Sequence, residues 1–353
     1  MKRLKATDGP VRAAPTMRVC ITGGAGFIGS HLAKRLRADG HYVVVADWKK
    51  NEFMDPSEYC DEFRHLDLRT LDACLAAVDG CEEVYHLAAD MGGMGFIQSH
   101  NAQILFNNST ISCHVLEACR RSPGGVRRVF FASSACVYPE HLQADTGLGH
   151  GLREEDAWPA APQDAYGLEK LATEELCRHY MADYGLETRV ARFHNVYGPF
   201  GTWRGGREKA PAALCRKAAL AGPDRPLEVW GDGEQTRSFM YIDDCVEGIL
   251  RIMRSDVREP LNLGTDEMVS INALARLVLD VAEKRAVGIV HRPGPQGVRG
   301  RNSNNEKIRR LLGWEPAVPL RDGITKTYAW VAGEVKGALA QGEGPAGSAT
   351  SGL

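Results

Sequence analysis

Gly23-Gly24-Ala25-Gly26-Phe27-Ile28-Gly29 is the stretch that decides the fold of this chain. It follows a short apolar run, Arg18–Thr22, and precedes a segment with helical spacing, His31–Ala38. A second strand-like run, Tyr42–Ala46, then ends at Asp47. Glycines spaced G-x-x-G-x-x-G between a strand and a helix allow a tight turn, and backbone N–H groups can then approach a pyrophosphate at the helix N-terminus. This order of elements predicts the first unit of a dinucleotide-binding sheet.

The turn and the acids that follow it are the predicted cofactor contacts. Asp47 would accept hydrogen bonds from ribose hydroxyls, and its charge would repel a 2′-phosphate, so NAD is expected rather than NADP. Asp67 follows the next strand and would either reach the adenine or cap the following helix. The alternative for the whole motif is a glycine-rich turn with a surface aspartate. The predicted cofactor-binding residues are Gly23, Gly26, Phe27, Ile28, Gly29, Asp47, Asp67, Tyr166 and Lys170.

Beyond this unit the chain keeps alternating between strands and helices. Helices are expected at Leu71–Val78, Asn108–Arg120 and Gln163–Asp183, and strands at Glu83–Leu87, Arg128–Ser133 and Thr188–Phe193. Helical segments of this length between strands indicate parallel βαβ units with right-handed crossovers. The predicted fold class is therefore α/β, a doubly wound parallel sheet with a smaller C-terminal α/β lobe.

Four parts are expected along the chain. Residues 1–16 would form a flexible N-terminal segment, 17–195 the dinucleotide-binding domain, 196–335 a smaller substrate lobe, and 336–353 a flexible tail. The lobe boundary is placed where turn signals such as Tyr197-Gly-Pro-Phe200 become frequent. We also expect segments of the C-terminal half to return to the first domain.

Composition excludes several classes of protein. The 353 residues carry 43 Lys and Arg against 45 Asp and Glu, so neither nucleic acid nor an anionic membrane is expected as a partner. No apolar run reaches transmembrane length, and the first 16 residues lack the apolar core of a secretory signal. None of the ten cysteines forms a C-x-x-C pair, so we expect no metal site and reduced thiols in a cytoplasmic protein.

Tyr166 and Lys170 are four residues apart and therefore share one helical face. An ammonium beside a tyrosine lowers the pKa of the phenol, which makes Tyr166 a candidate general base near neutral pH. Ser134, at the end of an earlier predicted strand, would hydrogen-bond the substrate hydroxyl that loses its proton. A Tyr–Lys pair alone is as readily a solvated surface pair, but behind a dinucleotide turn the catalytic interpretation is favoured.

Five motifs together resemble the extended short-chain dehydrogenase/reductase superfamily, in its NAD-dependent epimerase/dehydratase branch. They are the glycine turn, His86-Leu-Ala-Ala89, Ser133-Ser134-Ala135, Tyr166-x-x-x-Lys170 and Arg192-Phe-His-Asn-Val-Tyr-Gly-Pro199. The resemblance covers roughly residues 17–332. It implies an NAD-binding Rossmann domain, a C-terminal lobe for a nucleotide sugar, and a homodimer.

The residue at position 136 helps to distinguish the reactions that members of this superfamily catalyse. Its 4,6-dehydratases carry an Asp-Glu pair after the serine or threonine, whereas this chain has Ala135 and Cys136. A thiol beside a cation can exchange protons near neutral pH, and the alternative is a small buried cysteine that fills space. Lys209 opens a predicted helix after a glycine pair, where the helix N-terminus and Arg207 would lower its pKa. A solvated basic loop is the alternative for Lys209.

Long stretches, such as Gly201–Pro211, resemble the members of the superfamily that epimerise GDP-mannose at C3 and C5. The resemblance implies conversion of GDP-α-D-mannose to GDP-β-L-galactose, with GDP-L-gulose as a side product, a step toward ascorbate. A C4-epimerase, a dehydratase-like enzyme or a non-catalytic NAD-binding regulator is the alternative.

The same resemblance implies the residue roles. Tyr166, Lys170 and Ser134 would serve a transient oxidation at C4 by bound NAD⁺. Cys136 and Lys209 would then exchange protons at C5 and C3 from opposite faces of the sugar. The residues expected to bind the nucleotide sugar are Gly93, Ser134, Cys136, Asn195, Glu208, Lys209, Ala210, Lys217, Gln235, Arg237 and Arg301.

Overall fold

The computed structural model describes residues 16–92, 94–144, 151–294 and 297–342. At its centre is a seven-stranded parallel sheet in the order β10-β6-β5-β4-β1-β2-β3. The strands are β1 (Arg18–Thr22), β2 (Tyr42–Asp47), β3 (Glu62–His65), β4 (Glu83–His86), β5 (Arg128–Ser134), β6 (Glu187–Phe193) and β10 (Leu261–Leu263). The strand order runs outward from β1 in both directions, so a crevice opens at the carboxyl ends of β1 and β4. The predicted doubly wound sheet is confirmed.

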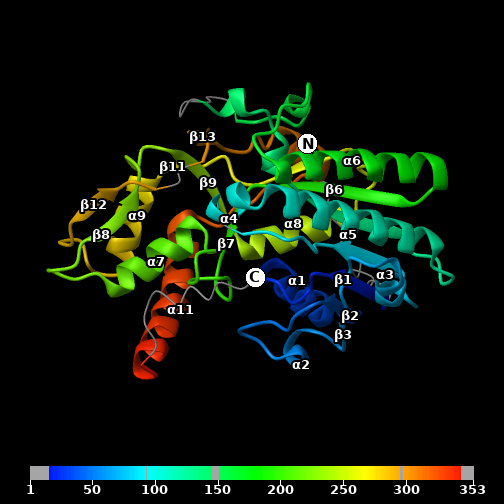
Figure 1. Ribbon diagram of the computed structural model, residues 1–353, viewed down its shortest axis with the longest axis horizontal. Coiled ribbons are helices and arrows are strands. Elements are labelled where there is room, and N and C mark those ends of the chain that lie inside the picture. The colour runs from blue at the N-terminus through cyan, green and yellow to red at the C-terminus, as the bar shows by residue number, and fades with distance from the viewer. Residues whose placement is uncertain (1–15, 93, 145–150, 295–296, 343–353) are drawn as a thin grey trace, which may run out of the picture.

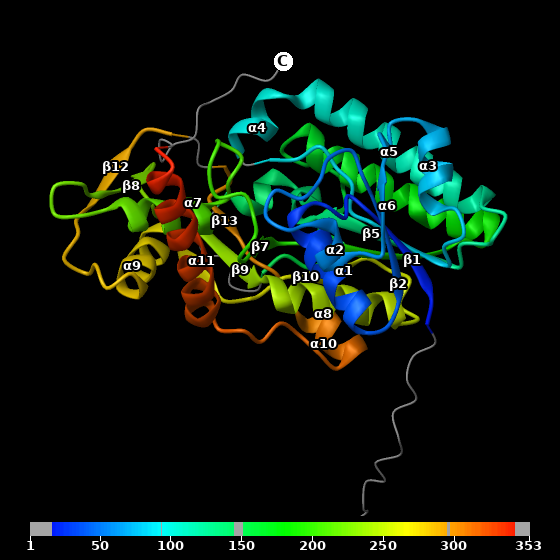
Figure 2. The same cartoon turned by 90° about the horizontal axis from the view of Figure 1, so that it is seen from below.

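Helices cover both faces of this sheet (Figure 2). On one face lie α3 (Leu71–Val78), α5 (Asn101–Arg121) and α6 (Ala165–Tyr184), and on the other lie α1 (Phe27–Ala38) and α8 (Ile242–Arg254). Successive strand residues point to opposite faces. In β1, for example, Val19 and Ile21 enter the core beside α1 and α8, whereas Cys20 enters the core beside α3, α5 and α6. Both faces are therefore apolar, as a buried parallel sheet requires.

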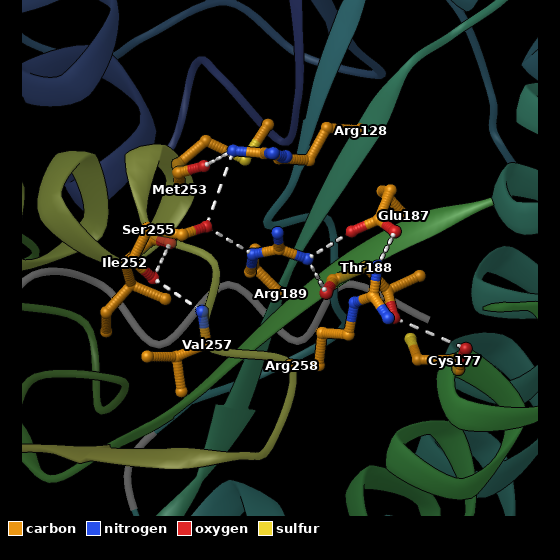
Figure 3. Close-up of polar contacts among 10 residues, drawn as sticks. All are labelled: Arg128, Cys177, Glu187, Thr188, Arg189, Ile252, Met253, Ser255, Val257 and Arg258. Atoms are coloured by element: carbon orange, nitrogen blue, oxygen red, sulfur yellow. Dashed lines mark hydrogen bonds and ion pairs between the residues drawn. The ribbon is translucent and has the colours of Figure 1, made fainter. Parts of the chain in front are cut away.

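The C-terminal end of α8 is anchored to the first residues of β5 and β6 (Figure 3). Arg128 Nη1 donates to the carbonyl oxygen of Met253 at 2.6 Å, and Arg189 Nε donates to that of Ser255 at 2.8 Å. Guanidinium groups are favourable here because the carbonyl end of a helix carries partial negative charge. Glu187 accepts from Arg189 and also from Arg258, which holds the buried Arg189 in place. A helix from the second half of the chain thus becomes part of the first domain.

The smaller lobe lies beside the carboxyl end of the sheet and contains two short sheets (Figure 1). In one, β9 (Thr236–Tyr241) pairs with β7 (Asn195–Tyr197), β11 (Met268–Ser270) and β13 (Gly300–Arg301). In the other, β8 (Leu227–Trp230) pairs with β12 (Ile289–Arg292). The helices that pack in this lobe are α7 (Ala210–Leu220), α9 (Ile271–Val281) and α11 (Leu320–Ala340). The remaining short helices are α2 (Pro56–Tyr59), α4 (Met94–Ser99), η1 (Ala135–Val137), η2 (Glu140–Gln143), η3 (Glu154–Ala157) and α10 (Glu306–Leu312).

Two predicted boundaries are wrong. The tail expected over 336–353 does not begin there, because α11 continues to Ala340 and buries Val335 and Ala338 against the lobe. The helix expected from Asn108 already begins at Asn101, and its first two turns mix polar side chains with the exposed apolar side chains of Leu105 and Phe106. Residues 1–15 of the predicted N-terminal segment and 343–353 of the predicted tail lie outside the described residues.

All ten cysteines are free thiols, and eight of them are buried. Across the described residues, no helix combines the length and apolarity needed to cross a membrane. The same residues contain no group of three or more His, Cys, Asp or Glu side chains that could hold a metal ion.

Candidate active site

The glycine turn joins the carboxyl end of β1 to α1, at the crevice in the sheet. Gly23 has a φ of 71°, and a Cβ there would lie 2.7 Å from the backbone nitrogen of Ala88. A Cβ on Gly29 would lie 2.5 Å from the carbonyl oxygen of Gly23. Gly26 is the N-cap of α1 and no side chain caps this helix, so the N–H groups of its first turn face the crevice side of the turn. The turn therefore fits a cofactor pyrophosphate.

Asp47, at the end of β2, is bound to the same turn. Its Oδ2 accepts from the backbone N–H of Ala25 at 3.1 Å, and its Oδ1 accepts from that of Lys49 at 3.2 Å. Burial raises the pKa of Asp47, while these N–H groups favour its charged form. Each carboxylate oxygen keeps acceptor capacity for another donor. This arrangement fits the ribose hydroxyls of a dinucleotide.

Asp67 is not the cap of α3. The side chain of Thr70 caps that helix by accepting from the backbone N–H of Ala73, so this alternative is wrong. Asp67 instead forms a half-exposed ion pair with Arg69, with 2.5 Å between Oδ2 and Nη2. Its contact with an adenine stays a prediction.

Tyr166 and Lys170 are both buried on α6. The Tyr166 side chain hydrogen-bonds that of Ser134, at the end of β5. Lys170 Nζ is 5.6 Å from the centre of the Tyr166 ring, 4.8 Å from that of Phe131, and 3.8 Å from Glu169 Oε2. Burial raises the pKa of Tyr166 well above its usual value. The net shift is opposite to the predicted one, because burial of the phenol dominates. The lowering effect of Lys170 itself stays a prediction.

Cys136 lies two residues beyond Ser134, in η1. Its backbone N–H donates to Ser134 Oγ at 3.2 Å, which fixes the start of this turn. Helix α6 passes so close that a Cβ on Gly167 would lie 2.1 Å from the carbonyl oxygen of Cys136. The glycine that follows Tyr166 thus allows Tyr166, Ser134 and Cys136 to meet.

A cavity between the two lobes brings the predicted substrate residues together. It extends from the end of β5 to the first turns of α7 and to β8, β9 and β13. The predicted residues that line it are Ser134, Cys136, Asn195, Glu208, Lys209, Ala210, Lys217, Gln235, Arg237 and Arg301. Gly93 lies outside the described residues. Neighbouring positions 91 and 92 line the cavity.

Lys209 is the N-cap residue of α7 and faces Cys136 across this cavity. Burial lowers the pKa of Lys209, Arg301 lowers it further, and Cys136 acts in the opposite direction. The predicted lowering of the Lys209 pKa is therefore confirmed, and burial, not Arg207, is its largest cause. Arg207 instead lies 3.8 Å from Asp90, measured from Nη1 to Oδ1.

Several cationic side chains line the cavity, and one of them, Arg301, contacts Cys136. Burial and the charge of the neighbouring Arg301 lower the pKa of Arg237 to about 9, so Arg237 remains charged at neutral pH. Lys217 Nζ donates to the Glu228 carbonyl oxygen at 2.9 Å and lies 5.1 Å from the centre of the Trp230 ring. Gln235 Oε1 is buried with no partner in the described structure. Such a site suits a diphosphate and a base with hydrogen-bond donors.

Two of the predicted substrate-binding residues, Glu208 and Asn195, form hydrogen bonds to other parts of the protein. The oxygens of Glu208 accept from the Gly206 N–H at 2.7 Å and from Arg216 Nη2 at 2.8 Å, so Glu208 shapes the loop before α7. Asn195 Nδ2 donates to the carbonyl oxygen of Ser238 at 3.1 Å. Both residues still line the cavity.

Comparison with known proteins places these features in a family. The model of the NAD dependent epimerase/dehydratase family matches residues 19–264. The chain belongs to this family. Membership confirms the predicted resemblance, and the glycine turn with Asp47 fits the NAD after which the family is named.

Relatives within the epimerase/dehydratase family differ in how closely they match. GDP-mannose 3,5-epimerase 1 of Oryza sativa subsp. japonica is 57% identical, with 95% of this chain and 87% of the relative covered. GDP-mannose 3,5-epimerase of Arabidopsis thaliana is 56% identical, with 92% and 85% covered. UDP-glucuronic acid decarboxylase 1 of Xenopus tropicalis is 32% identical, with 90% and 73% covered.

Solved structures of the epimerase/dehydratase fold are similar over most of the chain. The UDP-glucose 4-epimerase of Thermus thermophilus, in complex with NAD, has a TM-score of 0.77 at 26% identity, with 90% of this chain and all of that chain covered. The UDP-glucose 4-epimerase of Thermotoga maritima has a TM-score of 0.79 at 25% identity, with 90% and 99% covered.

Among the residues near the cavity that the sequence did not predict, three bear on the site. Gly167 allows α6 to approach Cys136, and its signal was a glycine directly after the catalytic tyrosine candidate. Trp230 lines the cavity although half of the side chain is exposed, and an aromatic residue ending a strand was its signal. Gln163 also lines the cavity and had no signal.

Proposed function

We propose that the protein epimerises GDP-mannose at C3 and C5 to GDP-L-galactose, with GDP-L-gulose as a side product. One observation carries this proposal: Cys136 from the first domain and Lys209 from the smaller lobe line the same cavity. Inversion of a carbon by proton exchange needs one group on each face of the sugar, and a thiol and an amine can fill these roles. The 57% and 56% identity to proteins named GDP-mannose 3,5-epimerase supports the choice of substrate.

The reaction must first make the C3 and C5 hydrogens acidic. A ketone at C4 does this, because both positions are then α to a carbonyl. NAD, when bound, supplies the electron acceptor and donor for this temporary oxidation. As phenolate, Tyr166 would accept the proton of the C4 hydroxyl, which Ser134 orients. The ammonium of Lys170, on the same helix, would favour this charged form against the burial that opposes it. Lys170, buried beside Tyr166, would hold the nicotinamide ribose.

Proton exchange at C5 and then at C3 would use Cys136 and Lys209. Burial lowers the pKa of Lys209, which brings its neutral form closer to the working pH. We assign proton removal to Cys136 and proton return to Lys209. Between the two inversions the Cys136 thiol would lose its proton to water and the Lys209 amine would take one up, so that both groups are ready for the exchange at C3. The sugar must turn between the two exchanges while its GDP group stays bound, and Arg237, Arg301 and Lys217 support a fixed position for the GDP.

The test is incubation of the protein with GDP-mannose in D₂O, followed by analysis of the recovered sugar. Deuterium at both C3 and C5 is expected. Deuterium at neither position would contradict the proposal and would favour a simple C4-epimerase. Cys136→Ala and Lys209→Ala should each abolish exchange, and exchange that survives both changes would exclude the two-base assignment.

Two further parts of the proposal concern the assembly and its location. Free thiols at all ten cysteines support a reducing, cytoplasmic location. Exposed Leu105 and Phe106 on α5 and Leu168 on α6 support a homodimer through these helices. Light scattering of Phe106→Glu against the wild type tests the second point, because a loss of dimer mass is expected.

A further inference from the structure

Two segments from different lobes meet at the rim of the cavity. One follows β4 and leads into α4, and the other lies between β7 and α7. Arg207 Cζ, from the second segment, lies 3.9 Å from the centre of the Phe96 ring in the first. Arg207 Nη1 is also 3.8 Å from Asp90 Oδ1. The flanking residues Ile97 and Gly206 line the cavity, so this contact joins the lobes directly beside it.

The contact is firmly held on the side of the first domain. Asp90 Oδ2 accepts from Gln103 Nε2 at 3.1 Å and from Asn107 Nδ2 at 3.2 Å. The backbone N–H of Asp90 donates to Asn108 Oδ1 at 2.6 Å, so three residues of α5 position this aspartate. Phe96 stacks on His100, with 4.5 Å between ring centres. Arg207 therefore meets partners whose places are already set.

On the side of the smaller lobe, the segment that carries Arg207 begins with two glycines. Gly205 and Gly206 precede Arg207 with φ angles of 88° and 84°, and a Cβ at either position would meet nothing within 4 Å. These glycines therefore serve the backbone conformation and not close packing. Lys209 follows two residues after Arg207. Glu208 ties this segment to Arg216 of α7 at 2.8 Å, so a turn about the two glycines would carry Lys209 and the start of α7 together toward or away from Cys136.

We propose that Arg207 is a positioning residue that latches the two lobes over the sugar until the reaction cycle is complete. This inference rests on the proposed function, in which the sugar is a ketone between its oxidation and its reduction. Oxidation at C4 removes two electrons and two protons: the electrons and one proton pass to oxidised NAD, and the other proton passes to Tyr166. Reduction returns both electrons and both protons to the sugar. A ketone that escapes early leaves the enzyme with one equivalent of reduced cofactor.

The latch also has a consequence for the product. Inversion at C5 and inversion at C3 are successive steps on one bound sugar, so a sugar reduced and released early carries only the first inversion. A weaker latch should therefore raise the share of GDP-L-gulose relative to GDP-L-galactose. A residue with only a structural role would lower the total rate and leave this ratio unchanged.

The experiment compares Arg207→Ala, Arg207→Lys and a matched control, Arg251→Ala, with the wild type. Arg251 also combines an aromatic contact, 5.5 Å from the Trp314 ring centre, with an ion pair, 2.7 Å from Glu247, but it lies on α8. After turnover of GDP-mannose we expect Arg207→Ala to raise the GDP-L-gulose share at least twofold and to accumulate reduced cofactor, read by its near-ultraviolet absorbance. Arg207→Lys should show a smaller effect, because an ammonium lacks the planar contact of a guanidinium. Arg251→Ala should match the wild type.

An unchanged product ratio together with no reduced cofactor in Arg207→Ala would overturn the latch while leaving the proposed function intact. Failure of the wild type to exchange deuterium with GDP-mannose would instead reject the proposed function. A substrate-free measurement then still tests the latch: amide hydrogen exchange of residues 205–209, the segment that carries Arg207, should be several-fold faster in Arg207→Ala than in Arg251→Ala. Equal exchange in the two variants would reject it.

Discussion

Arg301 Nη1 donates a hydrogen bond to the sulfur of Cys136 over 3.3 Å. The guanidinium is held there because Arg301 Nε also donates to Gln143 Oε1. The sequence predicts Arg301 as one of the residues that bind the nucleotide sugar, and the structure also brings it to the thiol proposed to remove the sugar protons. A hydrogen bond from a guanidinium holds the sulfur in place and complements negative charge on it, so Arg301 can support Cys136 as the proposed base.

The first prediction is that Arg301→Gln slows deuterium exchange at C5 by about 100-fold, the size of a typical general-base contribution. The loss should fall mainly on kcat, because the thiolate acts in the chemical step. Arg299→Gln is the matched control, since Arg299 pairs with Asp232 at 3.0 Å on the surface two residues away. A rise in KM with unchanged kcat would assign Arg301 to substrate binding alone.

The second prediction concerns the approach of α6 to Cys136. Gly167→Ala places a methyl group 2.1 Å from the Cys136 carbonyl oxygen, so α6 and η1 must separate. We expect a loss of roughly 1–3 kcal/mol in unfolding free energy and about 100-fold in exchange rate, because a small shift moves Tyr166 from Ser134. Thermal unfolding and deuterium exchange measure the two effects.

Gly333→Ala is the control for that substitution. Gly333 is also inside a helix, α11, but a Cβ there would meet nothing within 4 Å. Alanine should stabilise the protein by roughly 0.5–1 kcal/mol at this position and leave the exchange rate unchanged. Equal behaviour of the two alanine variants would disprove the close-approach argument.

Local sequence was sufficient to predict the sheet and its cofactor turn. The tight turn requires glycines at Gly23, Gly26 and Gly29, and the ribose contact requires an acid at the strand end, Asp47. Both requirements are local, so a sequence pattern expresses them directly. The helix start at Asn101 was missed because polar and exposed apolar side chains are mixed in the first turns of α5. The helix end at Ala340 was missed because the last turn of α11 is rich in small residues, and tertiary packing decides where such a helix ends.

The cavity residues were predicted through family motifs, but their contacts were not. The pairs Arg301–Cys136 and Arg207–Asp90 join parts of the chain that are far apart in sequence, and no local pattern encodes such pairs. The pKa of Tyr166 was predicted in the wrong direction for a related reason. The spacing to Lys170 is visible in the sequence, whereas burial depends on every element packed around the phenol.

The third prediction is that Asp47→Ser lowers the affinity for NAD by roughly 10- to 100-fold, the value of a hydrogen bond to a charged group. The change should also reduce the preference for NAD over NADP, because the negative charge that repels a 2′-phosphate is lost. Titration of cofactor-free protein with both nucleotides measures this. Asp72→Ala, an exposed acid in the first turn of α3, should bind NAD normally. An unchanged NAD affinity in Asp47→Ser would exclude a ribose contact.

The fourth prediction is that the protein loses stability as the pH falls from 6.5 toward 3. Burial lowers the pKa of both His86 and His194 from 6.5 to about 3. In that window the unfolded chain binds protons that the folded chain does not, so the free energy of unfolding falls with pH by roughly 1.4 kcal/mol per pH unit for each histidine. Lys170 near His86, and Arg192 and Arg301 near His194, also lower these two pKa values.

Urea unfolding across the window should show a shallower slope for His194→Gln than for the wild type. His65→Gln is the control, because His65 is exposed on β3, and its slope should match the wild type. Equal slopes for all three proteins would mean that these buried rings do not govern the acid sensitivity of the fold.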